Sequence, residues 1–187
     1  MHIGMAITIV AALAQAARAE QKLDVFINGG ESIPFATLHS AKALASRMFT
    51  TADVRIAWHR GTRSGWKGRN RVLIIQMEMN TPTEFHPGAL GSSLPFEGVH
   101  VSIFYDRIRQ MNREDLPTLL LAHAMVHEIT HMLQGVERHS ATGVMKARWD
   151  WDDYLLMERQ PLPFTPEDIQ MIRKAESRPA IIAAKIP

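Results

Sequence analysis

The chain has 187 residues, of which 46% are apolar and 21% charged, and its formal net charge is +2. This length and composition are typical of a single globular domain with a sizeable core. So small a charge gives no reason to expect binding to nucleic acid or to a membrane surface. The absence of cysteine excludes disulfides, cysteine-ligated zinc and a thiol nucleophile.

The first 19 residues differ from the rest of the chain. Met1–Ala19 carries one formal charge, Arg18, contains an apolar run over residues 3–14, and ends in the small-x-small pattern Ala17-Arg18-Ala19. The run is shorter than the 20 or so residues of a membrane span. A buried N-terminal helix is the alternative, but the pattern favours a signal peptide at 1–19. We therefore expect a secreted or periplasmic, soluble protein whose mature chain is one domain, residues 20–187.

Apolar patterns then predict four strands, at residues 23–28, 54–58, 72–79 and 99–105, the third from a nearly continuous apolar run and the others from alternation. A helix opens at Pro34 between the first two strands, because Leu38, Ala41, Ala45 and Met48 recur at helical spacing. A strand, a helix and a strand with short joins favour a right-handed crossover between parallel strands. The third strand is nearly all apolar, which is typical of a central position.

Residues 60–71, between the second and third strands, are rich in arginine and glycine. A phosphate-binding loop is conceivable, but the spacing of a P-loop and the helix that follows one are both missing. We expect a solvated hairpin or surface loop.

A long helix of about 18 residues is predicted to start at Asp115 and Pro117, because residues 119–134 contain no breaker before Gly135. It is apolar nearly all round, which is typical of a buried helix. A last helix begins at Thr165-Pro166, where threonine caps and proline fits the first turn. Residues 176–187 are expected to be a weakly held tail.

The long helix carries the motif His127-Glu128-Ile129-Thr130-His131. A spacing of four residues puts both imidazoles on one face of a helix, where they can share a zinc ion. Glu128 flanks that metal and can act as the general base toward a zinc-activated water. The competing interpretation is a row of core histidines that satisfy one another, since His123 extends the row. For His123 itself we expect a structural role, because metal binding there would misplace Glu128.

A catalytic zinc takes three protein ligands. Gly135 lets the chain turn back toward the metal, and the next candidates are Glu137 and His139. Both residue types are acceptable ligands, so the helix motif alone leaves the third ligand open.

The segment His127-Glu128-x-x-His131-x-x-x-Gly135-x-x-x-His139-Ser140 followed by Gly143-Val144-Met145 resembles the metzincin metallopeptidases, matrixins most closely. The resemblance implies a zinc helix, a third histidine and a methionine turn below the metal. It favours His139 over Glu137, because residues 140–145 are placed relative to His139. The glycine and third histidine follow His131 by four and eight residues, instead of three and six. Ala147 stands where some members carry a catalytic tyrosine, for which Tyr154 is a possible substitute.

The resemblance implies an α+β (or α/β) fold. We expect a mixed four- to five-stranded sheet with a crossover helix and a buried zinc helix in an upper subdomain, residues 20–135. The lower subdomain, residues 136–187, would be small and end in a helix. Peptide would bind along the strand at 99–105, taken as the edge strand. A cluster of large apolar residues would line the pocket or pack the lower core: Trp149, Trp151, Tyr154, Leu155 and Leu156.

The sequence thus predicts a monomeric zinc endopeptidase that acts on peptide or protein substrates. Two other functions stay open: a non-catalytic zinc-bound binding module, which would have no need of Glu128, and a zinc hydrolase of another amide. Similarity of fold does not separate substrates.

Overall fold

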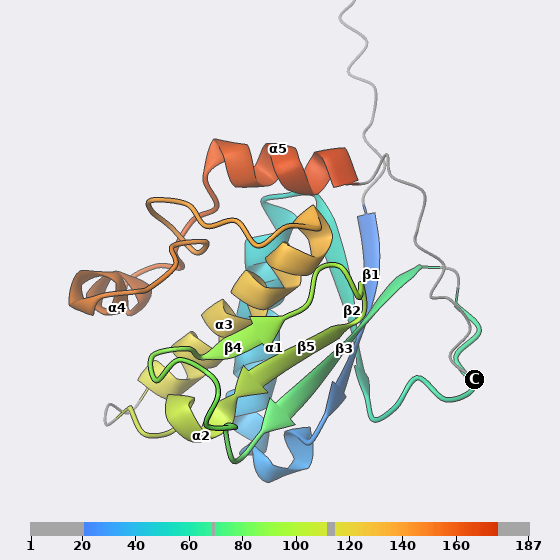
Figure 1. The fold of residues 1–187 in the computed structure, drawn as a ribbon, viewed down its shortest axis with the longest axis horizontal. Helices are drawn as coiled ribbons and strands as arrows, with labels where there is room; N and C mark the ends of the chain where they lie inside the picture. Colours follow the sequence, from blue (N-terminus) through green and yellow to red (C-terminus); the bar gives the residue numbers. More distant parts are fainter. Residues whose placement is uncertain (1–20, 69, 112–114, 176–187) are drawn as a thin grey trace, which may run out of the picture.

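The computed structural model describes residues 21–68, 70–111 and 115–175, so the expected signal peptide and tail lie outside the described residues. The strands form one sheet in the order β2-β1-β3-β5-β4 (Figure 1). They are β1 (Gln21–Asn28), β2 (Val54–Arg60), β3 (Arg71–Glu78), β4 (Gly91–Ser93) and β5 (His100–Phe104). The helices are η1 (Gly30–Ser32), α1 (Phe35–Thr50), α2 (Tyr105–Ile108), α3 (Leu116–Gln134), α4 (Trp151–Met157) and α5 (Pro166–Ala175).

The crossover helix and the mixed five-stranded sheet confirm the expected fold class. β1 pairs in parallel with both β2 and β3, and α1 connects β1 to β2. β3 has the central position that its apolar sequence predicted. The core lies between the sheet and two helices, since Leu23, Val25 and Ile27 of β1 pack with apolar side chains of α1 and α3.

The edge of the sheet differs from the expectation. β5 is not an edge strand, because β4 pairs with it in antiparallel register, Ser92 opposite Ser102. β5 also ends at Phe104, and Tyr105 begins α2 instead of completing the strand. β4 was not predicted because its sequence, Gly-Ser-Ser, has no apolar alternation.

The basic segment between β2 and β3 is a surface loop, as expected. A hairpin is ruled out because both strands run parallel to β1. The loop returns over the face of the sheet away from α1, where Trp66 contacts Phe26 and His59. The buried carboxylate of Asp24 holds this loop, since it accepts a hydrogen bond from Asn70 at 2.9 Å and contacts His59 at 2.6 Å.

The long helix α3 has 19 residues and is almost wholly buried, as its composition predicted. It ends at Gly135, whose φ of 70° lies in the left-handed region that favours glycine. None of the described helices is both long enough and apolar enough to cross a membrane.

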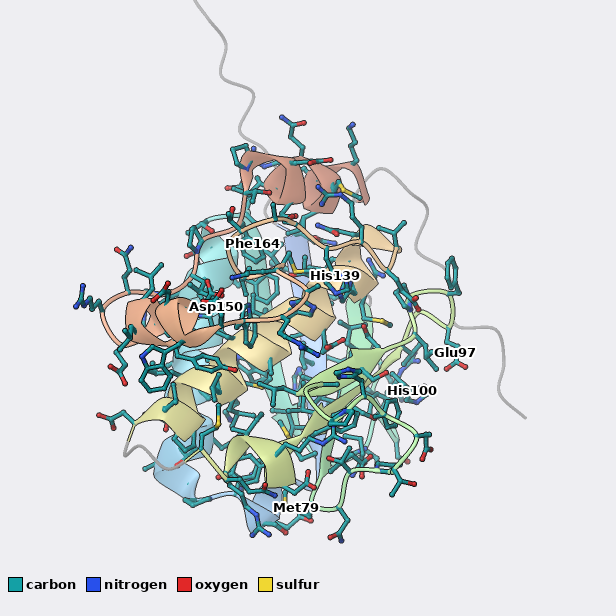
Figure 2. The ribbon with its side chains drawn as sticks, turned by 60° about the vertical axis from the view of Figure 1, so that its left-hand side comes forward. Met79, Glu97, His100, His139, Asp150 and Phe164 are labelled. Atoms are coloured by element: carbon teal, nitrogen blue, oxygen red, sulfur yellow. The ribbon has the colours of Figure 1, made fainter. Side chains whose placement is uncertain are left out.

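The chain after Gly135 crosses α3 before it reaches α4 and α5. In Figure 2 His139 lies over α3, whereas Asp150 lies at the start of α4, near the edge of the molecule. Asp150 caps α4 by accepting hydrogen bonds from the backbone of Asp152 and Asp153. Thr165 caps α5 as expected: its hydroxyl accepts a hydrogen bond from Asp168 N. The division into two subdomains at Gly135 stays a prediction.

Candidate metal centre

The two motif histidines meet on one face of α3. Their Nε2 atoms lie 3.0 Å apart. Each ring also has its Nδ1 beside a backbone carbonyl, Val144 O for His127 at 2.8 Å and Val136 O for His131 at 3.1 Å. A carbonyl oxygen only accepts, so each neutral ring must carry its proton on Nδ1.

It follows that two Nε2 lone pairs face each other, which is unfavourable unless a cation lies between them. Two nitrogens that bind one tetrahedral zinc at 2.0–2.1 Å are about 3.3 Å apart. The observed spacing therefore fits a shared zinc ion, and the carbonyls supply the outer hydrogen bonds that orient metal-binding imidazoles.

His139 completes the group. The ligand atoms of His127, His131 and His139 all lie within 4.8 Å of one another. The ring of His139 is 5.2 Å from that of His127 and 4.9 Å from that of His131, centroid to centroid. Glu137 is exposed and is not part of this group. The structure thus brings together the three histidines that the sequence singled out.

Burial keeps these imidazoles neutral, the state in which they bind a metal. It lowers the pKa of His127 to about 3, with a further contribution from the neighbouring His131. Burial likewise lowers the pKa of His131 and of His139. A neutral site of three nitrogens suits zinc.

The loop after His139 closes on itself as a turn. Ser140 N donates to Met145 O at 2.8 Å, and Val144 N donates to Pro163 O at 3.0 Å. Gly143 has a φ of 77°, and a Cβ there would overlap the Pro163 carbonyl. Val144 and Met145 are both fully buried. The turn therefore delivers the Val144 carbonyl to His127.

A buried carboxylate ties this loop to α5. Asp168 is fully buried and accepts hydrogen bonds from Ser140 Oγ at 2.7 Å and from Arg138 at 3.1 Å. Its second oxygen accepts from Thr165 N and Oγ1. Ser140 and Arg138 flank His139, so Asp168 fixes the chain on both sides of it.

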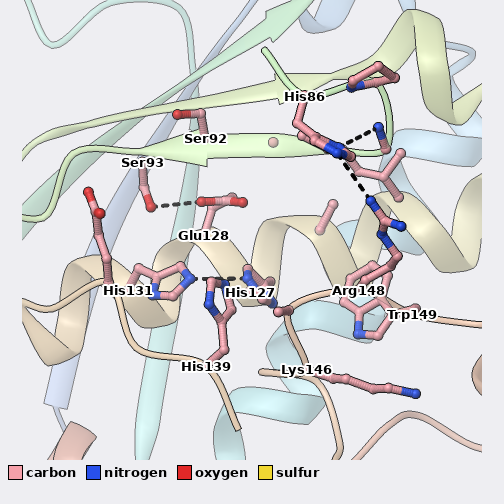
Figure 3. Close-up of a pocket in the computed structure, with 18 of the residues that line it drawn as sticks. His86, Ser92, Ser93, His127, Glu128, His131, His139, Lys146, Arg148 and Trp149 are labelled. Atoms are coloured by element: carbon pink, nitrogen blue, oxygen red, sulfur yellow. Dashed lines mark hydrogen bonds between the residues drawn. The ribbon is translucent and has the colours of Figure 1, made fainter. Parts of the chain in front are cut away.

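Glu128 lies on the cavity side of α3, beneath β4. Ser93 Oγ donates a hydrogen bond to Glu128 Oε2 at 2.7 Å (Figure 3). A Cβ on Gly91 would lie 2.7 Å from Glu128 Cγ, so only glycine leaves room for this side chain. Burial raises the pKa of Glu128 to about 7, although the Ser93 hydroxyl acts in the opposite direction. A carboxyl with this pKa can both take and give a proton near neutral pH.

His123 has the structural role that we expected. Its Nδ1 donates to Leu119 O at 2.7 Å, and its Nε2 accepts from Leu162 N at 3.0 Å. Both ring nitrogens are used, and burial lowers the pKa of His123 to about 4. The ring joins α3 to the segment before α5.

A cavity of about 770 Å³ opens beside the three histidines and Glu128. β4 and the loop before it line one side, and residues 146–149 line the other. The apolar cluster after Met145 has both expected roles in part. Trp149 and Tyr154 line the cavity and Leu156 packs against the core, whereas Trp151 is 57% exposed and has neither role.

The crystal structure of archaemetzincin from Methanopyrus kandleri has a similar fold. The TM-score is 0.57 at 16% sequence identity, and the match covers 86% of this chain and 97% of that one. The chain has the archaemetzincin fold. Identity this low supports the fold alone. No protein-family model and no curated protein sequence matches the chain.

The archaemetzincin fold confirms the expected metzincin-type architecture, while the closer resemblance to matrixins stays a prediction. Sequence reasoning missed several residues of the cavity, among them His86, Gly91, Ser93 and Arg148. None stands in a motif. A glycine next to two serines, ahead of a strand, was the one signal available for Gly91 and Ser93.

Proposed function

We propose that this chain is a zinc-dependent peptidase in which His127, His131 and His139 hold the metal. The observation that carries the proposal is the pair of Nε2 atoms at 3.0 Å, each aimed by a carbonyl on its Nδ1. In the described residues we find no hydrogen-bond donor between the two atoms that would explain their approach. A metal ion explains it.

Zinc, when bound, would polarise a water molecule and the carbonyl of the scissile amide. Glu128 takes the proton of that water and returns it to the leaving amine. In the metal-free site burial raises the pKa of Glu128 to about 7, so the carboxyl can take either protonation state near neutral pH. The Ser93 hydroxyl fixes the carboxylate by its hydrogen bond, and Gly91 leaves room for the side chain.

The edge of the sheet supports a peptide as substrate. β4 pairs only with β5 among the described strands, so its other side can pair with an extended chain. β4 lines the cavity that contains Glu128. Main-chain pairing with an edge strand recognises backbone and suits peptides. From the sequence we further propose endopeptidase activity, and export to the periplasm or the medium.

Metal analysis with an activity assay tests the proposal. Purified protein should contain about one zinc per chain and cleave a mixed peptide library, with loss of cleavage after chelation and recovery with zinc. Glu128→Gln should keep zinc but lose cleavage by at least about a hundredfold, because the base is removed while the ligands remain. A protein that stays metal-free in excess zinc would contradict the proposal. Full zinc with equal activity in both forms would assign catalysis to another group.

A further inference from the structure

One contact crosses the cavity away from the three histidines. Arg148 Nη2 lies 3.3 Å from His86 Nε2. His86 belongs to the loop before β4 and Arg148 to the segment after Met145, so the contact joins the two sides of the cavity. Figure 3 places it at one end of the residues drawn, with His131 toward the other end.

The hydrogen bonds at this contact cannot all be satisfied within the protein. Gly88 N lies 3.1 Å from His86 Nδ1, which must accept if that bond forms. A neutral imidazole has one acceptor nitrogen, and a guanidinium only donates. When Nδ1 accepts from Gly88, Nε2 carries a hydrogen and faces the Arg148 N–H groups. Two donors then point at one place, where an oxygen acceptor would serve both.

The His86 loop is held firmly in this position. Arg107 of α2 donates to His86 O at 2.6 Å and to Ala89 O at 2.9 Å. It also donates to Phe85 O at 3.3 Å, so one guanidinium binds three carbonyls of the loop. The donors are therefore placed before any ligand arrives, which lowers the entropic cost of binding.

Two cationic side chains line the cavity, Lys146 and Arg148. Lys146 contacts Asp150 at 2.5 Å and Asp153 at 2.6 Å. Arg148 has no acidic partner in the described part of the chain. Of the two carboxylates that line the cavity, Glu128 accepts a hydrogen bond from Ser93 and makes no contact with Arg148. Glu137 is exposed and influences the pKa of His131 and His139 instead.

We propose that Arg148 and His86 bind a carboxylate of the peptide substrate. This inference rests on the proposed peptidase function and adds what the substrate must carry. The carboxylate would lie close to the scissile bond, because Trp149, the next residue after Arg148, contacts the His127 ring edge-on with centroids 5.8 Å apart. A free α-amino group is disfavoured there, since its positive charge would face the guanidinium of Arg148.

The carboxylate can come from the C-terminus of the substrate or from an aspartate or glutamate side chain. A C-terminal carboxylate suits a contact that crosses the cavity, and cleavage would then release a short C-terminal fragment. A side-chain carboxylate would instead leave cleavage internal and make it selective for acidic sequence.

Three defined peptide sets distinguish these sources, with products identified by mass spectrometry. The sets are peptides without acidic residues that end in a free carboxylate, the same peptides amidated, and amidated peptides with one internal glutamate. Zinc-loaded wild type is compared with Arg148→Gln, Arg148→Lys and His86→Ala. The control Arg63→Gln removes an exposed arginine from the loop on the other face of the sheet.

Arg148→Gln should lower kcat/KM on the preferred carboxylate peptides about ten- to hundredfold, mainly through KM, because a charged hydrogen bond is lost. Cleavage of peptides without a carboxylate should change little, and Arg148→Lys should recover part of the loss. Preference for the free-acid set assigns the C-terminus, and preference for the glutamate set assigns a side chain. Equal rates on all three sets, or equal losses in Arg148→Gln, would overturn the proposal.

Binding separates this inference from the proposed function. Affinity for the same peptides is measured by calorimetry with Glu128→Gln, alone and combined with Arg148→Gln. Carboxylate-dependent binding that needs Arg148 would uphold this site even if no peptide were cleaved. Cleavage without any carboxylate preference in rate or affinity would uphold the peptidase and reject the site.

Discussion

The hydroxyl of Ser140 donates a 2.7 Å hydrogen bond to the buried carboxylate of Asp168, 28 residues further along the chain. Ser140 directly follows His139, whose ring meets the two histidines of α3. The position of the third histidine thus depends on a side chain of the last described helix. The same carboxylate accepts from Arg138, on the other side of His139.

Asp168→Asn should therefore weaken zinc binding about tenfold, the lower end of what outer-shell partners of a metal site contribute. The measurement is competition against a chelator of known affinity. Glu167→Gln is the matched control, because Glu167 pairs with Arg138 at the surface, where an ion pair contributes little. Equal affinities in Asp168→Asn and wild type would mean that the loop holds His139 without α5.

The same carboxylate should make stability depend on pH. Burial acts to raise the pKa of Asp168, but hydrogen bonds from Thr165, Ser140 and Arg138 outweigh it, and the pKa lies below its ordinary value. A carboxyl whose pKa is lower in the folded state stabilises that state above its unfolded pKa of about 3.9. The stabilisation is lost as the pH falls through the folded pKa.

The free energy of unfolding of metal-free wild type and Asp168→Asn should accordingly differ most at neutral pH. The difference should stay level down to about pH 5 and shrink below pH 4. Urea unfolding at a series of pH values measures it. A difference that grows in acid would reverse the sign and show that Asp168 is protonated in the folded protein.

Gly91→Ala should impair the catalytic base Glu128 without affecting metal binding. The new Cβ would lie 2.7 Å from Glu128 Cγ, so the Glu128 side chain must leave its present position. We expect full zinc content with peptide cleavage reduced about tenfold or more, since small misplacements of a catalytic group are costly. Ser92→Ala is the control, because in Figure 3 Ser92 points away from Glu128 while Ser93 points toward it.

His139→Ala should reduce zinc affinity strongly, whereas Glu137→Ala should change it little. The ligand atom of His139 lies in the group of three, whereas Glu137 is not part of that group. Zinc titration of both variants compares them directly. The reverse order of affinities would make the site two histidines and one carboxylate, and the methionine-turn alignment would be wrong by two residues.

Much of the zinc helix was predictable because its geometry is local. The spacing of His127 and His131 fixes their shared face in any α-helix, and Glu128 follows from the same geometry. The apolar residues on nearly all sides of α3 predicted its burial, and Gly135 predicted where it ends. β1, α1, β2 and β3 were found in the same way, from apolar periods of two and 3.6 residues.

The other side of the site was decided by tertiary structure. β4 has three small residues and no apolar period, and it exists because β5 offers it a partner. That pairing displaced β5 from the edge and brought Ser93 to Glu128 across 35 residues of sequence. His86 and Arg148 meet across 62 residues, and Asp168 reaches Ser140 from a separate helix. Contacts of this kind leave no periodic pattern in the sequence, because they depend on how whole helices and strands pack together and not on the local conformation of the chain.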